Sequence, residues 1–481
     1  MSDLSAAGWA EGHVRAALVA GSGPAGLATA LMLARAGWGV QVLDKRPPPP
    51  APQAREWADA PERSYNLGLT DRGQSTLEAL GMLDAVRQYS APNVGRQGWA
   101  KDGTPKINIK QGRKYTALCI QRDRLTSVLL EAARAHPAIS CSHETEVSGV
   151  AWEADGPAVT LAEKGTASGP ILRPALLVGA DGCGSAVAEA VAAAGEAEVV
   201  KFEDTNVRRY KTLPVDFDLH PDPASWRRDL NLSASAVDGA GVSLEVLPTA
   251  EGQGVGVALF RPGNEAIREA DTPEKARAML EQNFPLFKDL FSDRAMAAFA
   301  EQREQRLPGF SYVANSLHGD RTALLGDAIH CVKPYFGMGV NSAFEDVSVL
   351  EGCLEGVDPE GSGRAELNAA LEAFSEKHKG NAKALVTMQR SFDRKGPAGF
   401  FTFVLPIILD TLFNKLFPSV FSPNGIQMLQ RADLTFAEAA RIKRRDRVLQ
   451  VAALAAFFAA AARAVPWLVR RVLGLWLPGA A

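Results

Sequence analysis

The sequence has few cysteines and histidines and no large excess of either charge. Its 481 residues include 5 cysteines and 7 histidines, and the formal net charge is −3. No CxxC pair or cysteine/histidine cluster suggests a metal site, so we predict no bound metal. We expect reduced thiols in a cytosol-facing protein. Nothing in the net charge favours binding to nucleic acid. The cysteines are Cys119, Cys141, Cys183, Cys331 and Cys353.

The N-terminus lacks the features of a targeting signal. Residues 1–13 contain no apolar core, and the first strand-like run begins soon after them. A secretory signal needs an apolar segment before its cleavage site, so we expect none here. The composition is that of a globular protein, with 46% hydrophobic and 22% charged residues. A chain of this length is sufficient for two or three domains.

A glycine-rich turn stands near the N-terminus between two apolar runs. The runs at 16–20 and 40–43 are typical of buried strands, and the residues between them have helical spacing. The motif GxGxxG at 21–26 suits a tight turn, close approach of a pyrophosphate and close packing of the helix. Asp44 follows the second run and can accept from a ribose hydroxyl. The stretch predicts a dinucleotide site formed by Gly21, Gly23, Pro24, Ala25, Gly26, Asp44, Lys45 and Arg46.

Two further turns follow buried strands later in the chain. One contains Asp181 and the next glycine, and the other contains Gly326 and Asp327, whose carboxylate can bind a ribityl hydroxyl. A helix then begins near residue 339, and its N-terminus can face a flavin's pyrimidine oxygen, where negative charge builds on reduction. Three turns in this order indicate FAD rather than NAD. Further residues predicted at the flavin are Pro334, Gly337, Gly339, Val340 and Asn341.

The pattern predicts an α/β fold. A Rossmann-like FAD-binding domain spans 13–199, with an excursion near 90–118 toward the substrate site, and returns at 306–392. Short β-rich runs at 200–305 predict an inserted antiparallel β-sheet substrate domain. Residues 393–481 predict a C-terminal helical, membrane-associated tail.

Some local elements are also predicted. We expect a helix over 74–83 capped by Thr70 and its neighbours, and a helix over 339–354. A turn at 101–103 predicts a hairpin, whose strand pair runs on to 118–121.

The tail changes in composition from residue 400 onward. A basic run at 441–447 precedes a purely apolar run at 451–462, which Arg463 and Pro466 interrupt. Twelve apolar residues are fewer than the ~20 that span a bilayer. Basic flanks and aromatic residues favour contact with membrane lipid through 441–477, either across or along the bilayer. An alanine-rich packing helix is the alternative.

These features resemble the single-component aromatic hydroxylases, a family of FAD-dependent monooxygenases, over most of the chain. The resemblance is carried by Arg-Ser-Tyr-Asn-Leu-Gly-Leu-Thr-Asp-Arg-Gly at 63–73 and by the stretch from Leu324 to Asp346. It implies that Arg122 joins the FAD-binding residues and that residues 339–341 meet the isoalloxazine. It also implies that Asn341 and Arg96 serve the reaction, with Arg96 gripping a substrate carboxylate through its planar guanidinium.

The sequence departs from one membrane-anchored member of that family at the substrate end. That member has two tyrosines beside its arginine, where this chain has Lys110 and residues 384–388. Ser316 to His318 replace an aromatic pair, and Ala188 replaces an arginine. These departures leave FAD binding intact and are compatible with an aromatic acid other than that member's substrate.

The resemblance implies that NADPH reduces FAD and that O₂ then gives a flavin C4a-hydroperoxide, which hydroxylates the ring. No side-chain nucleophile or metal is required. We expect His330 to be structural, and Glu345 and Asp346 to be a solvated or capping pair. The alternatives are an FAD epoxidase or reductase acting on an isoprenoid lipid, a non-catalytic membrane-docked flavoprotein, and an NAD dehydrogenase. The resemblance further suggests a cytosol-facing membrane, with the mitochondrial outer membrane as first choice, and leaves the oligomeric state open.

Overall fold

A computed structural model describes residues 16–100, 102–110, 114–162, 169–237, 239–359, 361–394 and 396–476. Parts of three predictions lie outside the described residues. They are residues 13–15 at the start of the predicted FAD-binding domain, Lys101 in the predicted hairpin turn, and residue 477 at the end of the predicted lipid-binding tail. The chain divides into two compact units, Met1–Val386 and Thr387–Ala481.

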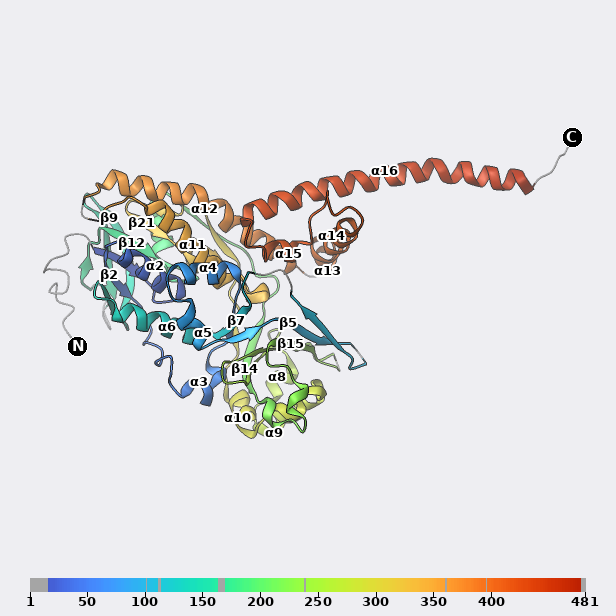
Figure 1. The fold of residues 1–481 in the computed structure, drawn as a ribbon, viewed down its shortest axis with the longest axis horizontal. Coiled ribbons are helices and arrows are strands. Elements are labelled where there is room, and N and C mark those ends of the chain that lie inside the picture. Colours follow the sequence, from blue (N-terminus) through green and yellow to red (C-terminus); the bar gives the residue numbers. More distant parts are fainter. Residues whose placement is uncertain are drawn as a thin grey trace. The chain divides into compact units, whose positions relative to one another are not determined.

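The centre of the first unit is a six-stranded sheet in which all neighbouring strands are parallel except the first pair (Figure 1). Its strands are almost entirely apolar because helices cover both faces of such a sheet. The order is β20 (His318–Gly319), β21 (Thr322–Leu324), β12 (Leu176–Gly179), β1 (Ala16–Ala20), β2 (Gly39–Leu43) and β8 (Ile139–Ser142).

Helices with one apolar face pack on this sheet and share one hydrophobic core with it. On α2, for example, Leu27, Ala30 and Leu31 lie on one helical face and are buried. The helices are α2 (Pro24–Arg35), α4 (Asp71–Ala79), α5 (Leu83–Gln88), α6 (Arg122–Ala135), α7 (Ala186–Ala193), α11 (Gly339–Leu354) and α12 (Arg364–Phe392).

Three small sheets adjoin this core. Their strands are β3 (Asn66–Leu69), β7 (Ala117–Gln121) and β4 (Ala91–Asn93); β11 (Ile171–Leu172), β10 (Gly156–Ala162) and β9 (Glu146–Glu153); and β13 (Glu198–Lys201), β19 (Ser311–Ala314) and β22 (His330–Cys331). Short helices connect elements at α3 (Glu56–Asp59), η1 (Pro61–Arg63), η5 (Gly326–Ala328) and η6 (Pro334–Phe336).

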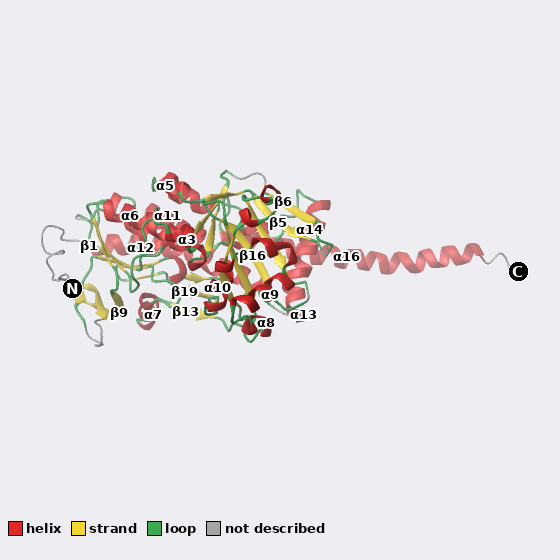
Figure 2. Ribbon diagram, turned by 90° about the horizontal axis from the view of Figure 1, so that it is seen from below, coloured by secondary structure: helices red, strands yellow, loops and turns green. Residues whose placement is uncertain are grey.

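A seven-stranded sheet lies beside the helices α8 (Glu265–Glu269), α9 (Pro273–Asn283) and α10 (Asp293–Glu301) (Figure 2). This part has a hydrophobic core of its own, which includes Leu213, Leu244 and Phe260 of the sheet and Leu280 and Phe299 of the helices. The strand order of the sheet is β18 (Gln305–Arg306), β14 (Arg209–Val215), β17 (Gly254–Phe260), β16 (Ser243–Pro248), β15 (Leu230–Ser235), β5 (Gly95–Trp99) and β6 (Pro105–Ile109). Beside it also lie η2 (Phe217–Leu219), η3 (Pro223–Ser225) and η4 (Pro285–Leu290).

Two local predictions are wrong. The helix expected over 74–83 begins at Asp71 and ends at Ala79, because Gly81 adopts a left-handed conformation at φ 64° and closes it. The expected hairpin forms between β5 and β6, but its pairing does not run on to 118–121. That segment is β7, and it pairs with β3 and β4 in a separate sheet.

The second unit is helical. It contains α13 (Gly396–Gly399), the π-helical segment η7 (Phe400–Val404), α14 (Leu405–Leu416), α15 (Gly425–Leu429) and α16 (Phe436–Trp476). Arg463 and Pro466 interrupt the apolar run in the sequence, and the backbone of α16 continues past both of them. Among the described residues, two segments could cross a membrane by length and composition: Gly396–Leu416 and Phe436–Val465.

Candidate flavin site

The first glycine turn joins β1 to α2 and is closed on one side by backbone contacts. Gly21 has φ 102°, and a Cβ there would lie 2.4 Å from the carbonyl oxygen of Ala180. A Cβ on Gly26 would lie 1.9 Å from the carbonyl oxygen of Gly21. Only glycine fits at either position, so the turn is held tightly between two strands and the helix.

The same turn is open at Gly23, where an added Cβ would have no atom within 4 Å. Gly23 precedes Pro24 and Ala25, the first residues of α2, and no side chain caps this helix end. The first N–H groups of the helix therefore point into open space, as an anion-binding helix N-terminus requires. This cradle fits a pyrophosphate.

Asp44 ends β2 beside this turn and is an ionised carboxylate. Its Oδ2 accepts hydrogen bonds from the N–H and hydroxyl of Ser22, both at 2.9 Å, and its Oδ1 accepts from the N–H of Arg46 at 2.8 Å. Burial raises the pKa of Asp44, but the hydrogen bonds from Arg46 and Ser22 outweigh burial and lower the pKa to about 2. The neighbouring Lys45 lies away from the turn, 3.5 Å from Glu146.

The other two turns lie at the carboxyl ends of β12 and β21, next to β1 in the sheet. Asp181 caps α7, because its carboxylate accepts from the N–H of Ala186 at 2.7 Å and from the Ser185 hydroxyl. Burial raises the pKa of Asp181. Asp327 differs, since the residue reaches the surface while Gly326 beside it is buried, although the surrounding protein raises the pKa of the Asp327 carboxyl group by partial desolvation. Asp327 is therefore the carboxylate of this pair that is open to a ligand.

Arg122 begins α6 and forms an ion pair with Asp123 at 3.0 Å. Its side chain is one-third exposed. The Arg122 guanidinium therefore lies partly exposed at the surface of the first unit.

Asn341 holds the start of α11 in place. Its side-chain Nδ2 donates to the carbonyls of Gly68 and Gly337 at 2.7 and 2.6 Å, and its Oδ1 accepts from the N–H of Thr70 at 2.8 Å. The side chain is fully buried. Because its amide group is used within the protein, Asn341 can reach a flavin only through its backbone. Its role is to position the helix end that begins at Gly339.

Pro334 and Gly337 bound η6, the short helix before α11. Gly337 adopts φ 65°, which lets the chain reverse into the first turn of α11. Val340 is half-buried in that first turn.

Arg96 lies on β5 of the seven-stranded sheet. Its guanidinium donates to the hydroxyl of Ser233 and to a carboxylate oxygen of Glu245, both at 2.6 Å. Just over half of its side chain, 57%, is exposed, so it also remains open to a ligand. Burial raises the pKa of Glu245, although the charge of Arg96 opposes this. Sequence reasoning found Arg96 but not its two partners, which come from other strands.

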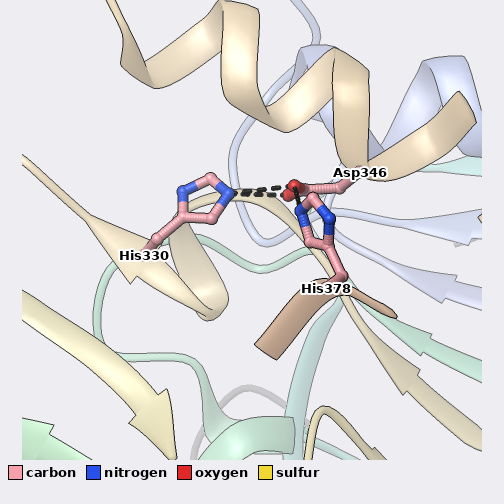
Figure 3. A group of neighbouring side chains, drawn as sticks. All are labelled: His330, Asp346 and His378. Carbon is pink, nitrogen blue, oxygen red and sulfur yellow. Dashed lines mark hydrogen bonds and ion pairs between the residues drawn. The ribbon is translucent and has the colours of Figure 1, made fainter. Parts of the chain in front are cut away.

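A buried cluster behind the Gly326–Asp327 turn was missed. Asp346 accepts hydrogen bonds from the ring Nε2 atoms of His330 and His378, at 2.8 and 2.5 Å, as Figure 3 shows. The expected solvated or capping role of Asp346 is wrong, because the side chain is 0% exposed. His378 lies 32 residues further along the chain, on another helix, and no local pattern marks it.

The expectation of five reduced thiols is wrong for two of them. A disulfide joins Cys183 to Cys331 across 148 residues of sequence. The topology places the Asp181 turn next to β22, which brings these two cysteines together. Cys119, Cys141 and Cys353 are free.

Fold and site together define a flavoprotein. The sequence profile of the family described as "FAD binding domain" matches residues 15–387, and the chain belongs to this family of FAD-dependent monooxygenases. It is an aromatic-hydroxylase-type oxidoreductase that binds FAD.

Among curated proteins, the chain resembles the kynurenine 3-monooxygenases of two Salinispora species. It is 31% identical to that of Salinispora tropica over 454 residues, which cover 90% of this chain and 92% of the relative. It is 30% identical to that of Salinispora arenicola, with the same coverage. The sequence resemblance to aromatic hydroxylases, and to kynurenine 3-monooxygenase among them, is confirmed.

Solved structures show the same fold. A probable FAD-dependent monooxygenase from Pseudomonas aeruginosa matches with a TM-score of 0.59 at 20% identity, covering 81% of this chain and 99% of that protein. A mutant of 2-methyl-3-hydroxypyridine-5-carboxylic acid oxygenase matches with a TM-score of 0.61 at 21% identity, covering 81% and 96%.

The contrast between Gly26 and Gly23 gives a matched pair of variants. Gly26→Ala should lower the apoprotein's melting temperature, because its Cβ would collide with the Gly21 carbonyl. Gly23→Ala should leave that temperature nearly unchanged and weaken FAD binding about tenfold or more, because its Cβ enters the space of the pyrophosphate. Calorimetry of apoprotein and FAD titration separate the two effects. Equal FAD affinity in Gly23→Ala and wild type would contradict this placement.

Proposed function

We propose that this protein hydroxylates an aromatic acid with NADPH and O₂ as co-substrates. The observation that carries the proposal is the meeting of three turns at the carboxyl ends of β1, β12 and β21, three neighbouring strands of one sheet. Ligands of such sheets bind at this edge. FAD held there supplies the electron transfer and oxygen activation, which side chains cannot perform.

The chain's own residues bind and orient the cofactor. We assign the pyrophosphate to the open N-terminus of α2, a ribose hydroxyl to Asp44, and the ribityl chain to Asp327. The first turn of α11, fixed by Asn341, presents its N–H groups to the pyrimidine ring. The proposed FAD-binding residues are Gly21, Gly23, Pro24, Ala25, Gly26, Asp44, Lys45, Arg46, Arg122, Asp181, Gly326, Asp327, Pro334, Gly337, Gly339, Val340 and Asn341.

The seven-stranded sheet is the proposed substrate domain, with Arg96 as the group that binds the substrate carboxylate. Asn66 of β3 supports this arrangement, since its side-chain amide donates to the carbonyl of Pro248 at 2.8 Å and joins that sheet to the cofactor-binding part. The boundaries 13–199, 200–305, 306–392 and 393–481 are retained as proposed domains. Kynurenine, which the curated relatives' name contains, is the first ring acid to test, although Lys110 and residues 384–388 favour another.

The second candidate is an epoxidase or reductase acting on an isoprenoid lipid. It is supported by the apolar side chains that line η7 and α14 and remain exposed, among them Phe401, Ile408 and Leu416. A lipid substrate could reach the enzyme along such a surface.

A substrate panel distinguishes the two candidates. Purified protein with FAD is supplied with NADPH and O₂, and NADPH consumption is measured beside product mass. A gain of one oxygen on an aromatic acid supports the hydroxylase. Turnover of prenyl or squalene-like lipids, with none of kynurenine or other aromatic acids, would contradict it.

We also propose that the tail binds membrane lipid through residues 441–477, on a cytosol-facing membrane such as the mitochondrial outer membrane. The described part of α16 supports this, because its apolar side chains face solvent: Val448, Leu449, Val451, Phe457, Phe458, Val465 and Val469. Five basic residues precede them between 441 and 447. A helix that is apolar on all sides and follows a basic segment suits binding to a bilayer with anionic headgroups.

Changing Glu245 should alter substrate affinity with a predictable sign. Above its raised pKa, Glu245 is charged and occupies Arg96; below it, the guanidinium is released to a ligand. Carboxylate ligands should therefore bind more tightly as pH falls through that pKa. Glu245→Gln should bind them about tenfold more tightly at neutral pH and lose this pH dependence. Flavin absorbance changes on titration with aromatic acids measure both.

Glu153→Gln is the matched control, because Glu153 pairs with Arg173 on the surface at 2.9 Å. It should behave as wild type. Unchanged affinity in Glu245→Gln, together with unchanged affinity in Arg96→Gln, would remove Arg96 from the substrate site.

The tail is tested by replacing Phe457 and Phe458 with serine. Each phenylalanine is 65% exposed, so the folded enzyme should keep its melting temperature. Burying one such side chain in lipid is worth about 1.5–3 kcal/mol, so binding to anionic vesicles should weaken at least about tenfold. Sedimentation with vesicles measures binding. Leu286→Ser, at another exposed apolar position, is the control, and equal vesicle binding by both variants would contradict the assignment.

A further inference from the structure

The buried cluster of His330, Asp346 and His378 connects three separate elements to the flavin-binding turn. His330 is on β22, Asp346 on α11 and His378 on α12, and none is more than 2% exposed. The backbone N–H of Gly326 donates to Asp346 Oδ2 at 2.7 Å. One carboxylate thus accepts from two imidazoles (Figure 3). It also accepts from the backbone of the turn that carries Asp327.

The charges in this cluster balance each other. Burial raises the pKa of Asp346, but the charges of His330 and His378 and their hydrogen bonds outweigh it and hold that pKa below its usual range. Burial lowers the pKa of His330, but Asp346 outweighs it and leaves that pKa raised. Asp346 therefore favours the protonated form of His330, while the two histidines favour the ionised form of Asp346.

The distances are those of hydrogen bonds. Ligands of a tetrahedral zinc ion, about 2.0–2.1 Å from the metal, stand roughly 3.3 Å apart. The nitrogen–oxygen separations here are 2.8 and 2.5 Å. We treat these three groups as joined by hydrogen bonds.

We propose that Asp346, held by His330 and His378, is a positioning residue for FAD. It fixes the Gly326–Asp327 turn from behind, through the Gly326 N–H. It lies on the same helix, α11, whose first turn Asn341 fixes from the other side. The inference rests on FAD binding and is independent of the ring substrate.

A pH dependence of FAD binding follows from this arrangement. The charged groups facing the cluster are Asp327 on η5, Glu345 on α11 and Arg72 on α4, which is paired with Glu345. The positive charge of Arg122 on α6 lowers the pKa of Asp327 and so opposes the effect of burial. As pH rises through the raised pKa of His330, that imidazole loses its proton, and the cluster becomes more negative behind the turn that carries Asp327. FAD is itself anionic through its pyrophosphate. FAD affinity should therefore fall as pH rises.

The test titrates FAD into apoprotein from about pH 5.5 to about pH 9, followed by flavin fluorescence. For wild type, the dissociation constant should rise about tenfold or more across this range. Asp346→Asn should bind FAD about tenfold more weakly at the acid end and show little pH dependence. The double variant His330→Gln with His378→Gln keeps hydrogen-bond donors without titrating, so its affinity should be flat with pH. His220→Gln, on the exposed loop after η2, is the control and should match wild type.

Circular dichroism and apoprotein melting separate positioning from simple folding. If Asp346→Asn does not fold, the inference is tested by the pH dependence of FAD affinity in wild type and in the double variant His330→Gln with His378→Gln. A wild-type FAD affinity that does not change with pH would overturn the inference. So would variants whose melting temperature falls while their FAD affinity and its pH profile stay those of wild type, because that result describes a purely structural cluster.

Discussion

The backbone of Gly21 lies so close to the carbonyl of Ala180 that no side chain fits between them, with a Cβ only 2.4 Å from that oxygen. This contact brings the first glycine turn against the end of β12, and the pairing of β12 with β21 brings the Gly326–Asp327 turn to the same edge. Three turns that are far apart in the sequence thereby follow neighbouring strands at one edge of the sheet. The open N-terminus of α2, the exposed carboxylate of Asp327 and the fixed first turn of α11 all depend on this arrangement.

The parts of this site that the sequence could predict are those whose chemistry is local. The glycines at 21–26 and Asp44 belong to one strand–helix–strand unit, and the loop at 334–341 leads directly into α11, so short stretches were sufficient. The parts that it could not predict combine distant elements. Glu245 meets Arg96 only through strand register, and His378 reaches Asp346 from a helix with no motif of its own. The disulfide between Cys183 and Cys331 likewise depends on topology, since neither cysteine belongs to a recognisable pair. The early end of α4 differs, because Gly81 marks it in the sequence itself.

The site separates two tasks. Cofactor binding depends on backbone geometry and on carboxylates held by neighbouring N–H groups, which suits a cofactor common to a whole family. In the proposed function, selection of the ring acid would fall to side chains of the seven-stranded sheet, where Arg96 donates to Glu245 and Ser233. If Arg96 binds the substrate as proposed, a substrate carboxylate would compete with Glu245 for the guanidinium. On that proposal, the identity of the ring substrate is a question about the seven-stranded sheet and not about the flavin turns.

The central claim is that this protein uses FAD to insert one oxygen atom from O₂ into an aromatic acid. Turnover under ¹⁸O₂ in unlabelled water, with the product analysed by mass spectrometry, tests it most directly. The account predicts one ¹⁸O atom in each hydroxylated product and one NADPH oxidised for each product formed. Product oxygen derived from water, or NADPH oxidation that yields only hydrogen peroxide with every aromatic acid supplied, would contradict it.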